Sequence, residues 1–244
     1  MSSEQTSEAV IVDITIAAPV GEVWRALREP EQLKNWFGWD ADTLEEEIRF
    51  IFEQSATPNA EQTVLQFGGY QGVSDRFELA PEGAGTRLRV VRSGPVPTGG
   101  WGNVYDDMVE GWISFVAQLR LLLEHHPGEP RRTIYLSGQR TDSGALPRAA
   151  LQLGKTEVDA GYDAALPTDD WVAGEIWHQS RFQTGVTVSS WYLGLMIATD
   201  IPDAGEYGGG SLLVTTFGLH DGAFDQLKGR LESWWTANYP EKRG

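Results

Sequence analysis

Asp75 and Arg92 are the charged residues best placed for chemistry, because each interrupts a run of alternating apolar side chains. The runs 73–79 and 87–93 predict two strands of a hairpin, joined by a turn at 80–85. In this hairpin Asp75 and Arg92 are diagonal neighbours on one otherwise apolar face. Such a pair could orient the polar end of a ligand through charge-assisted hydrogen bonds. An ion pair at the rim of a sheet is the other interpretation.

Aromatic residues gather in two other stretches, WFGW at 36–39 and the segment from 101 to 112. A cavity for an apolar ligand is typically lined by aromatic side chains with few polar groups. The alternative is that these rings simply fill an ordinary core. The rings that predict a pocket are Trp36, Phe37, Trp39, Trp101, Tyr105 and Trp112.

Signals for catalysis or metal binding are weak. Tyr105 with Asp106 or Asp107 could serve acid–base chemistry on a carbonyl ligand, but acidic residues at a helix start also stabilise the helix dipole. His125 and His126 are adjacent and do not form the i, i+4 pair typical of a metal site. We therefore assign no catalytic residue, no metal and no cofactor. The sequence leaves open whether the protein is an enzyme and favours one that is not.

The composition limits the classes of binding partner that we expect this chain's surface to recognise. The chain has 35 acidic and 19 basic residues, which gives a formal net charge of −16, and it has no cysteine. A surface of this charge repels phosphate backbones and anionic lipid heads, so neither nucleic acid nor a membrane is expected as a partner. The start of the chain does not resemble a secretory signal, and no run of about 20 apolar residues is present. We expect a cytoplasmic protein.

Apolar periodicity predicts the elements that must position these residues. A strand at 9–16 leads into a short helix after Pro19, and a second short helix follows Pro30. After the strand-like runs, apolar residues recur at three- and four-residue steps from 105 to 123, which predicts a long helix. Proline and glycine in HPGEPRR end this helix. We place a domain boundary there, between 1–128 and 129–244.

The second half repeats part of the first. GTRLRVVRSG at 85–94 has a counterpart in GGSLLVTTFG at 209–218, and a helix is predicted after each. The second copy lacks about twelve residues between its last strand and its helix, because Gly94 precedes Trp112 by 18 positions but Gly218 precedes Phe224 by 6. The apolar face of the second helix consists of Phe224, Leu227, Leu231, Trp234 and Trp235.

Three stretches carry a resemblance to a known family: IAAPVGEVWRALREPEQLKNWFGWD, ELAPEGAGTRLRVVRSG and VYDDMVEGWISFVAQLRLLLE. Together they resemble the SRPBCC (START-like, helix-grip) superfamily, in a branch similar to the C-terminal domain of activators of the heat-shock chaperone ATPase. The resemblance covers about residues 9–125, and the second half only from about Gly174. The superfamily also includes polyketide cyclases, aromatases and plain carriers of lipids or hormones, so the fold alone does not choose a function.

The resemblance implies an α+β fold in which a curved antiparallel sheet wraps around a long C-terminal helix, repeated as an abbreviated second lobe. It also implies a cavity between sheet and helix. The residues expected near that cavity are Trp36, Phe37, Trp39, Phe77, Trp101, Tyr105, Met108 and Trp112, with Asp75 and Arg92 as the polar pair.

We expect the protein to bind a small hydrophobic molecule in this cavity, as a noncatalytic carrier or sensor. A cyclase, aromatase or hydratase-like enzyme that uses Tyr105 and the polar pair is one alternative. A chaperone-associated interaction protein is another, since Trp234 and Trp235 look exposed and the second half is degenerate.

Overall fold

The computed structural model describes residues 8–69, 72–94, 104–153, 157–202, 204 and 206–240, with the backbone alone at 104–107. The chain divides into two compact units, one formed by residues 1–99 and 111–128 and the other by 100–110 and 129–244. Within the described residues, no helix is long and apolar enough to cross a membrane.

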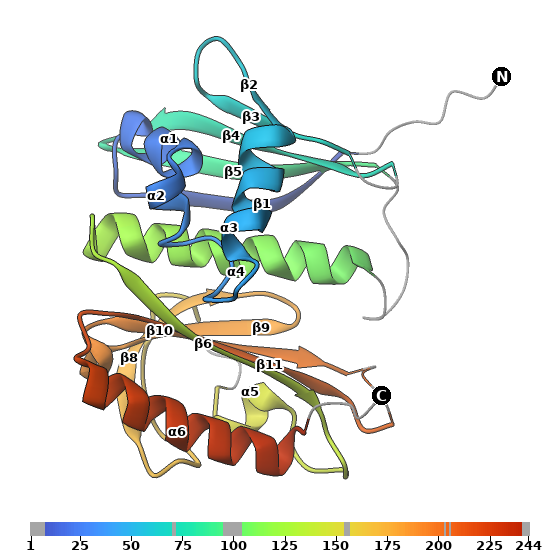
Figure 1. Ribbon diagram of the computed structural model, residues 1–244, viewed down its shortest axis with the longest axis vertical. Helices are drawn as coiled ribbons and strands as arrows, with labels where there is room; N and C mark the ends of the chain where they lie inside the picture. The colour runs from blue at the N-terminus through green and yellow to red at the C-terminus, as the bar shows by residue number, and fades with distance from the viewer. Residues whose placement is uncertain are drawn as a thin grey trace, which may run out of the picture. The chain divides into compact units, whose positions relative to one another are not determined.

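The N-terminal unit is one antiparallel sheet with helices (Figure 1). The strand order is β1-β5-β4-β3-β2. The elements are β1 (Glu8–Ile16), α1 (Val20–Arg28), α2 (Pro30–Leu33), α3 (Leu44–Ile48), a π-helix (Arg49–Gln54), β2 (Ala56–Pro58), β3 (Val64–Phe67), β4 (Ser74–Glu82), β5 (Gly85–Ser93) and, from residue 111 on, α4 (Val104–His125).

Prolines set the boundaries of the first two helices. Pro19 is extended and immediately precedes α1, while Pro30 occupies the first turn of α2. A proline at a helix start needs no hydrogen-bond partner for its missing N–H, and the residue before it is disfavoured in a helix. This is why α1 ends at Arg28 and a separate short helix follows, as the sequence predicts.

The β4–β5 hairpin is two residues out of the predicted register. Glu82 pairs with Gly85, so only residues 83 and 84 form the turn, and Gly83 has φ of 59°. Pro81 remains in β4 because the backbone bonding on that side of the strand ends with the N–H of Leu79, which donates to Thr63, and a proline is tolerated where a strand has a free edge. Asp75 and Arg92 are therefore directly opposite each other, and the predicted diagonal arrangement is wrong.

The C-terminal unit is a second antiparallel sheet with one long helix (Figure 1). The strand order is β6-β11-β10-β9-β8-β7, so in each unit the first strand pairs with the last. The elements are β6 (Arg131–Gln139), α5 (Pro147–Ala150), β7 (Gly161–Ala165), β8 (Trp171–Gln179), β9 (Gln183–Val188), a 3-10 helix (Ser189–Trp191), β10 (Gly194–Ile201), β11 (Gly209–Phe217) and α6 (Asp221–Asn238). The predicted α+β class is confirmed.

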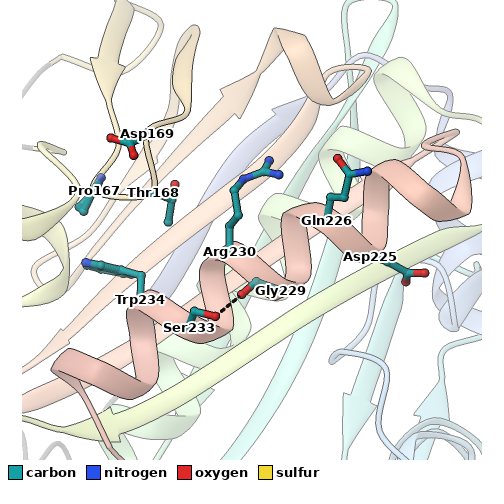
Figure 2. A pocket seen from close by; sticks show the side chains of 9 residues that line it. All are labelled: Pro167, Thr168, Asp169, Asp225, Gln226, Gly229, Arg230, Ser233 and Trp234. Atoms are coloured by element: carbon teal, nitrogen blue, oxygen red, sulfur yellow. Dashed lines mark hydrogen bonds between the residues drawn. The ribbon is translucent and has the colours of Figure 1, made fainter.

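The helix α6 buries its apolar side in the core of this unit. Phe224, Leu227, Leu231 and Trp235 belong to one buried cluster with residues of the sheet. Trp235 is only 3% exposed, so the expectation of an exposed Trp234–Trp235 pair is wrong for this residue. Trp234 is half-buried and borders a groove between α6 and the loop that joins β7 to β8 (Figure 2).

Candidate functional site

Asp75, Arg92 and Trp112 form a buried polar group on the inner face of the N-terminal sheet. Arg92 donates from Nε to Asp75 Oδ1 and from Nη2 to Asp75 Oδ2, each at 2.7 Å. Trp112 on α4 donates from Nε1 to Asp75 Oδ2, also at 2.7 Å. The exposed fractions of the Arg92 and Asp75 side chains are 2% and 4%, so this ion pair is not at an exposed rim.

The strand pattern explains why these charges point inward. Buried and less buried residues alternate along β4, and Asp75, Phe77 and Leu79 are its buried members. On β5, Leu88 and Arg92 are buried as well. Because successive side chains of a strand point to opposite faces, the charged pair shares its face with apolar residues, as the sequence predicts.

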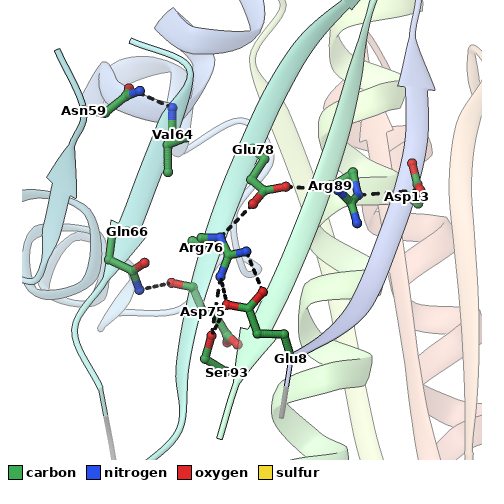
Figure 3. Close-up of polar contacts among 10 residues, drawn as sticks. All are labelled: Glu8, Asp13, Asn59, Val64, Gln66, Asp75, Arg76, Glu78, Arg89 and Ser93. Carbon is green, nitrogen blue, oxygen red and sulfur yellow. Dashed lines mark hydrogen bonds and ion pairs between the residues drawn. The ribbon is translucent and has the colours of Figure 1, made fainter. Parts of the chain in front are cut away.

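The outer face of the same hairpin carries exposed ion pairs instead (Figure 3). Arg76 donates to Glu8 and Glu78, while Arg89 lies within salt-bridge distance of Glu78 and Asp13. The hydrogen bond and charge of Arg76 lower the pKa of Glu8. Pairs of this kind are in contact with water and contribute little to stability. The inner pair is therefore distinguished by its burial.

Aromatic rings surround Trp112. Its ring centroid lies 4.9 Å from Phe77, 5.3 Å from Phe67 and 6.1 Å from Phe37. Phe52 is also within 6.4 Å. The arrangement combines one fixed guanidinium–carboxylate pair with an aromatic surrounding, which suits a ligand with an apolar body and one polar group.

The structure brings together five of the predicted site residues, Phe37, Asp75, Phe77, Arg92 and Trp112.

The other predicted residues have different positions. Trp36 is fully buried in the turn after α2, where it donates from Nε1 to the carbonyl oxygen of Ala26 in α1 at 2.9 Å and lies against Phe37 and Phe52. Trp39 is half-buried and lies 6.4 Å from Phe115. Met108 is partly buried and belongs to the residues grouped with the C-terminal unit. Trp101 and the side chain of Tyr105 lie outside the described residues.

Sequence reasoning missed Phe52 and Phe67 as neighbours of Trp112. Phe67 follows the alternation of VLQF, whose burial pattern places it on the same side as Leu65. The alternation in VLQF therefore indicates that Phe67 is buried. No local pattern indicates the position of Phe52, because IRFIF is rich in strand-forming residues but forms part of α3 and a π-helix.

Comparisons with known proteins give similarities at low sequence identity. No family model matches the chain, and no curated protein matches it. Three solved structures illustrate the similarity. The chain is 18% identical to DynU16, a protein in the dynemicin biosynthetic locus, with 94% of this chain and 95% of that chain covered and a TM-score of 0.36.

The second structure is the di-domain ARO/CYC StfQ from the steffimycin biosynthetic pathway, at 10% identity, with 93% and 91% of the two chains covered and a TM-score of 0.37. The third is the Aha1 dimer from Colwellia psychrerythraea, at 18% identity, with 50% of this chain and 99% of that chain covered and a TM-score of 0.38. Two of them, an ARO/CYC protein and an Aha1 protein by name, are of kinds that the sequence resemblance named.

Proposed function

We propose that the N-terminal unit binds a small, largely apolar molecule with one polar group, between the inner face of its sheet and α4. The protein acts as a carrier or sensor and does not transform the molecule. The single observation that carries this proposal is the buried group of Asp75, Arg92 and Trp112 within an aromatic surrounding.

Energetics support a role for this group beyond stability. Removing two charges from water costs several kcal/mol per ion, and apolar side chains of similar volume often stabilise a core at least as well. The two hydrogen bonds to Asp75 hold the plane of the Arg92 guanidinium in one orientation. Held in a fixed orientation, such a group suits recognition of a carboxylate, carbonyl or hydroxyl on a ligand.

The geometry of Asp75 favours binding over acid–base catalysis. Both of its carboxylate oxygens already accept charge-assisted or indole hydrogen bonds at 2.7 Å. A catalytic base must instead lie within hydrogen-bond reach of a substrate proton. The carboxylate thus orients Arg92 and Trp112.

We propose further that residues 1–128 and 129–244 are two domains with the same basic fold. We also propose that the protein is cytoplasmic. The shared pairing of first with last strand supports this division. The connection from β11 to α6 is residues 218–220, whereas that from β5 to α4 is residues 94–103. The connection is thus seven residues shorter in the second copy, which is part of the difference in length between the two.

Native mass spectrometry of the protein purified from its own host tests the proposal, because a buried apolar molecule often survives gentle handling. The defined probe is anilinonaphthalene sulfonate, which joins aromatic rings to an anionic group. We expect saturable binding by the wild type and at least tenfold weaker binding by the double variant Asp75→Leu/Arg92→Met.

The matched control is Asp13→Leu/Arg87→Met, which removes an exposed ion pair from the outer face of the same sheet. It should bind the probe as the wild type does. Wild-type affinity in a folded Asp75→Leu/Arg92→Met protein would show that the buried pair has no part in binding. A protein with no copurifying mass and no saturable probe binding would show that the rings only fill the core.

A further inference from the structure

The C-terminal unit has an open groove, about 730 Å³ in volume, that the proposed ligand site does not use. One side is the loop that joins β7 to β8, and the other is the middle of α6 (Figure 2). Trp234 and Asp225 both line it. They are nine positions apart on α6, which is about 13 Å along the axis and half a turn around it.

Arg230 joins the two sides of the groove through an ion pair with Asp170. It donates from Nε to Asp170 Oδ2 at 3.0 Å and from Nη2 to Asp170 Oδ1 at 2.8 Å. Thr168 also donates from Oγ1 to Asp170 Oδ2 at 2.7 Å. Figure 2 shows Arg230 extended from α6 toward this loop. The positive charge in the groove is thereby balanced, and the loop is held against the helix.

The remaining charges in the groove are negative. Asp169 and Asp225 are exposed, and neither has an ion-pair partner among the described residues. Trp234 is half-buried, and an indole face attracts cations in addition to apolar groups. The net charge of −16 strengthens the attraction for a cation, since the summed field of a protein steers charged partners to it.

We propose that this groove binds an extended basic segment of a partner protein. One arginine or lysine of that segment lies against Trp234 and Asp169, and a second lies near Asp225. The path from Trp234 to Asp225 runs about 13 Å along the helix and half-way around it, which is about 20 Å over the helix surface. At about 3.3 Å per residue, the two basic residues of an extended segment are therefore about six positions apart.

The open form of the groove favours a peptide over a small molecule. A small-molecule pocket typically buries most of its ligand's surface, which a groove open to water does not. A peptide can extend past both ends of the groove and gain contacts there. The negative charge disfavours nucleic acid and other anions.

The test is fluorescence anisotropy with a rhodamine-labelled peptide that has two arginines separated by five glycines. We expect saturable binding by the full chain that weakens as salt is raised. Gly229→Leu should weaken binding at least tenfold by filling the groove. This variant should fold, because a Cβ at Gly229 has no neighbour within 4 Å and the residue lies within α6.

The variant Asp169→Asn/Asp225→Asn should weaken binding at least fivefold and reduce its salt dependence. The control Glu46→Gln/Glu53→Gln removes the same charge from exposed positions of the other unit and should change affinity less than twofold. Wild-type affinity in Gly229→Leu would place the peptide elsewhere and overturn the proposal. Equal affinity for a peptide with glutamines in place of arginines, or no saturable binding, would also overturn it.

Discussion

Replacing Asp75 or Arg92 singly should destabilise the protein more than replacing both. Either single change leaves the other charge buried, at 2% or 4% exposure, without its partner. Breaking a buried pair in this way costs about 3–5 kcal/mol of unfolding free energy. A domain of this size has about 5–15 kcal/mol in total, so each single variant should be close to unfolding.

The double variant Asp75→Leu/Arg92→Met should be closer to wild-type stability than either single variant. Replacing a buried pair by apolar side chains is often neutral or stabilising in itself, but here Trp112 Nε1 also loses its acceptor on Asp75, which costs about 1–3 kcal/mol. With each single loss about 4 kcal/mol and the double loss about 2 kcal/mol, the coupling energy is roughly 6 kcal/mol, which is the two single losses minus the double loss. A double-mutant cycle measured by urea denaturation gives this value directly.

The exposed pair of Asp13 and Arg87 supplies the control for this cycle. Their side chains are 37% and 48% exposed, and such pairs contribute about 0–1 kcal/mol. Single losses at Asp75 and Arg92 that simply add in the double variant would refute the reasoning. They would show that the two charges are stabilised independently of each other.

Two further predictions concern the C-terminal unit. Tyr192 has φ of 53° with a side chain 64% exposed, so Tyr192→Gly should raise the unfolding free energy by about 1 kcal/mol; a lower melting temperature would contradict this. Burial raises the pKa of Tyr239 to about 12, whereas tyrosine in an unfolded chain ionises near pH 10. The stability that this tyrosine contributes is thus complete below pH 10 and is lost as the pH rises toward 12. Tyr239→Phe should make the unfolding free energy less dependent on pH between about 10 and 12. The control is Tyr207→Phe, which changes an exposed tyrosine. A Tyr239→Phe variant with the same pH dependence as the wild type would contradict this prediction.

Periodic patterns in the sequence correctly predicted the strands and helices, and their buried faces, where residues close together in the chain determine them. Alternation along residues 73–79 and 87–93 was enough to place Asp75 and Arg92 on one apolar face. Proline at 19 and 30 marked the starts of α1 and α2. Three- and four-residue steps predicted α4 and α6. These features depend on the few residues next to them in the chain.

The tertiary structure alone decided the register of the hairpin and the partners of its charges. The length of β3 left Pro81 at a free edge, which shortened the turn and brought Asp75 directly opposite Arg92. Trp112 reaches Asp75 across 37 positions of sequence. The groove likewise needs α6 and a loop some 60 positions earlier. Local patterns carry no information on such contacts, because they arise only when distant segments pack and exclude water together.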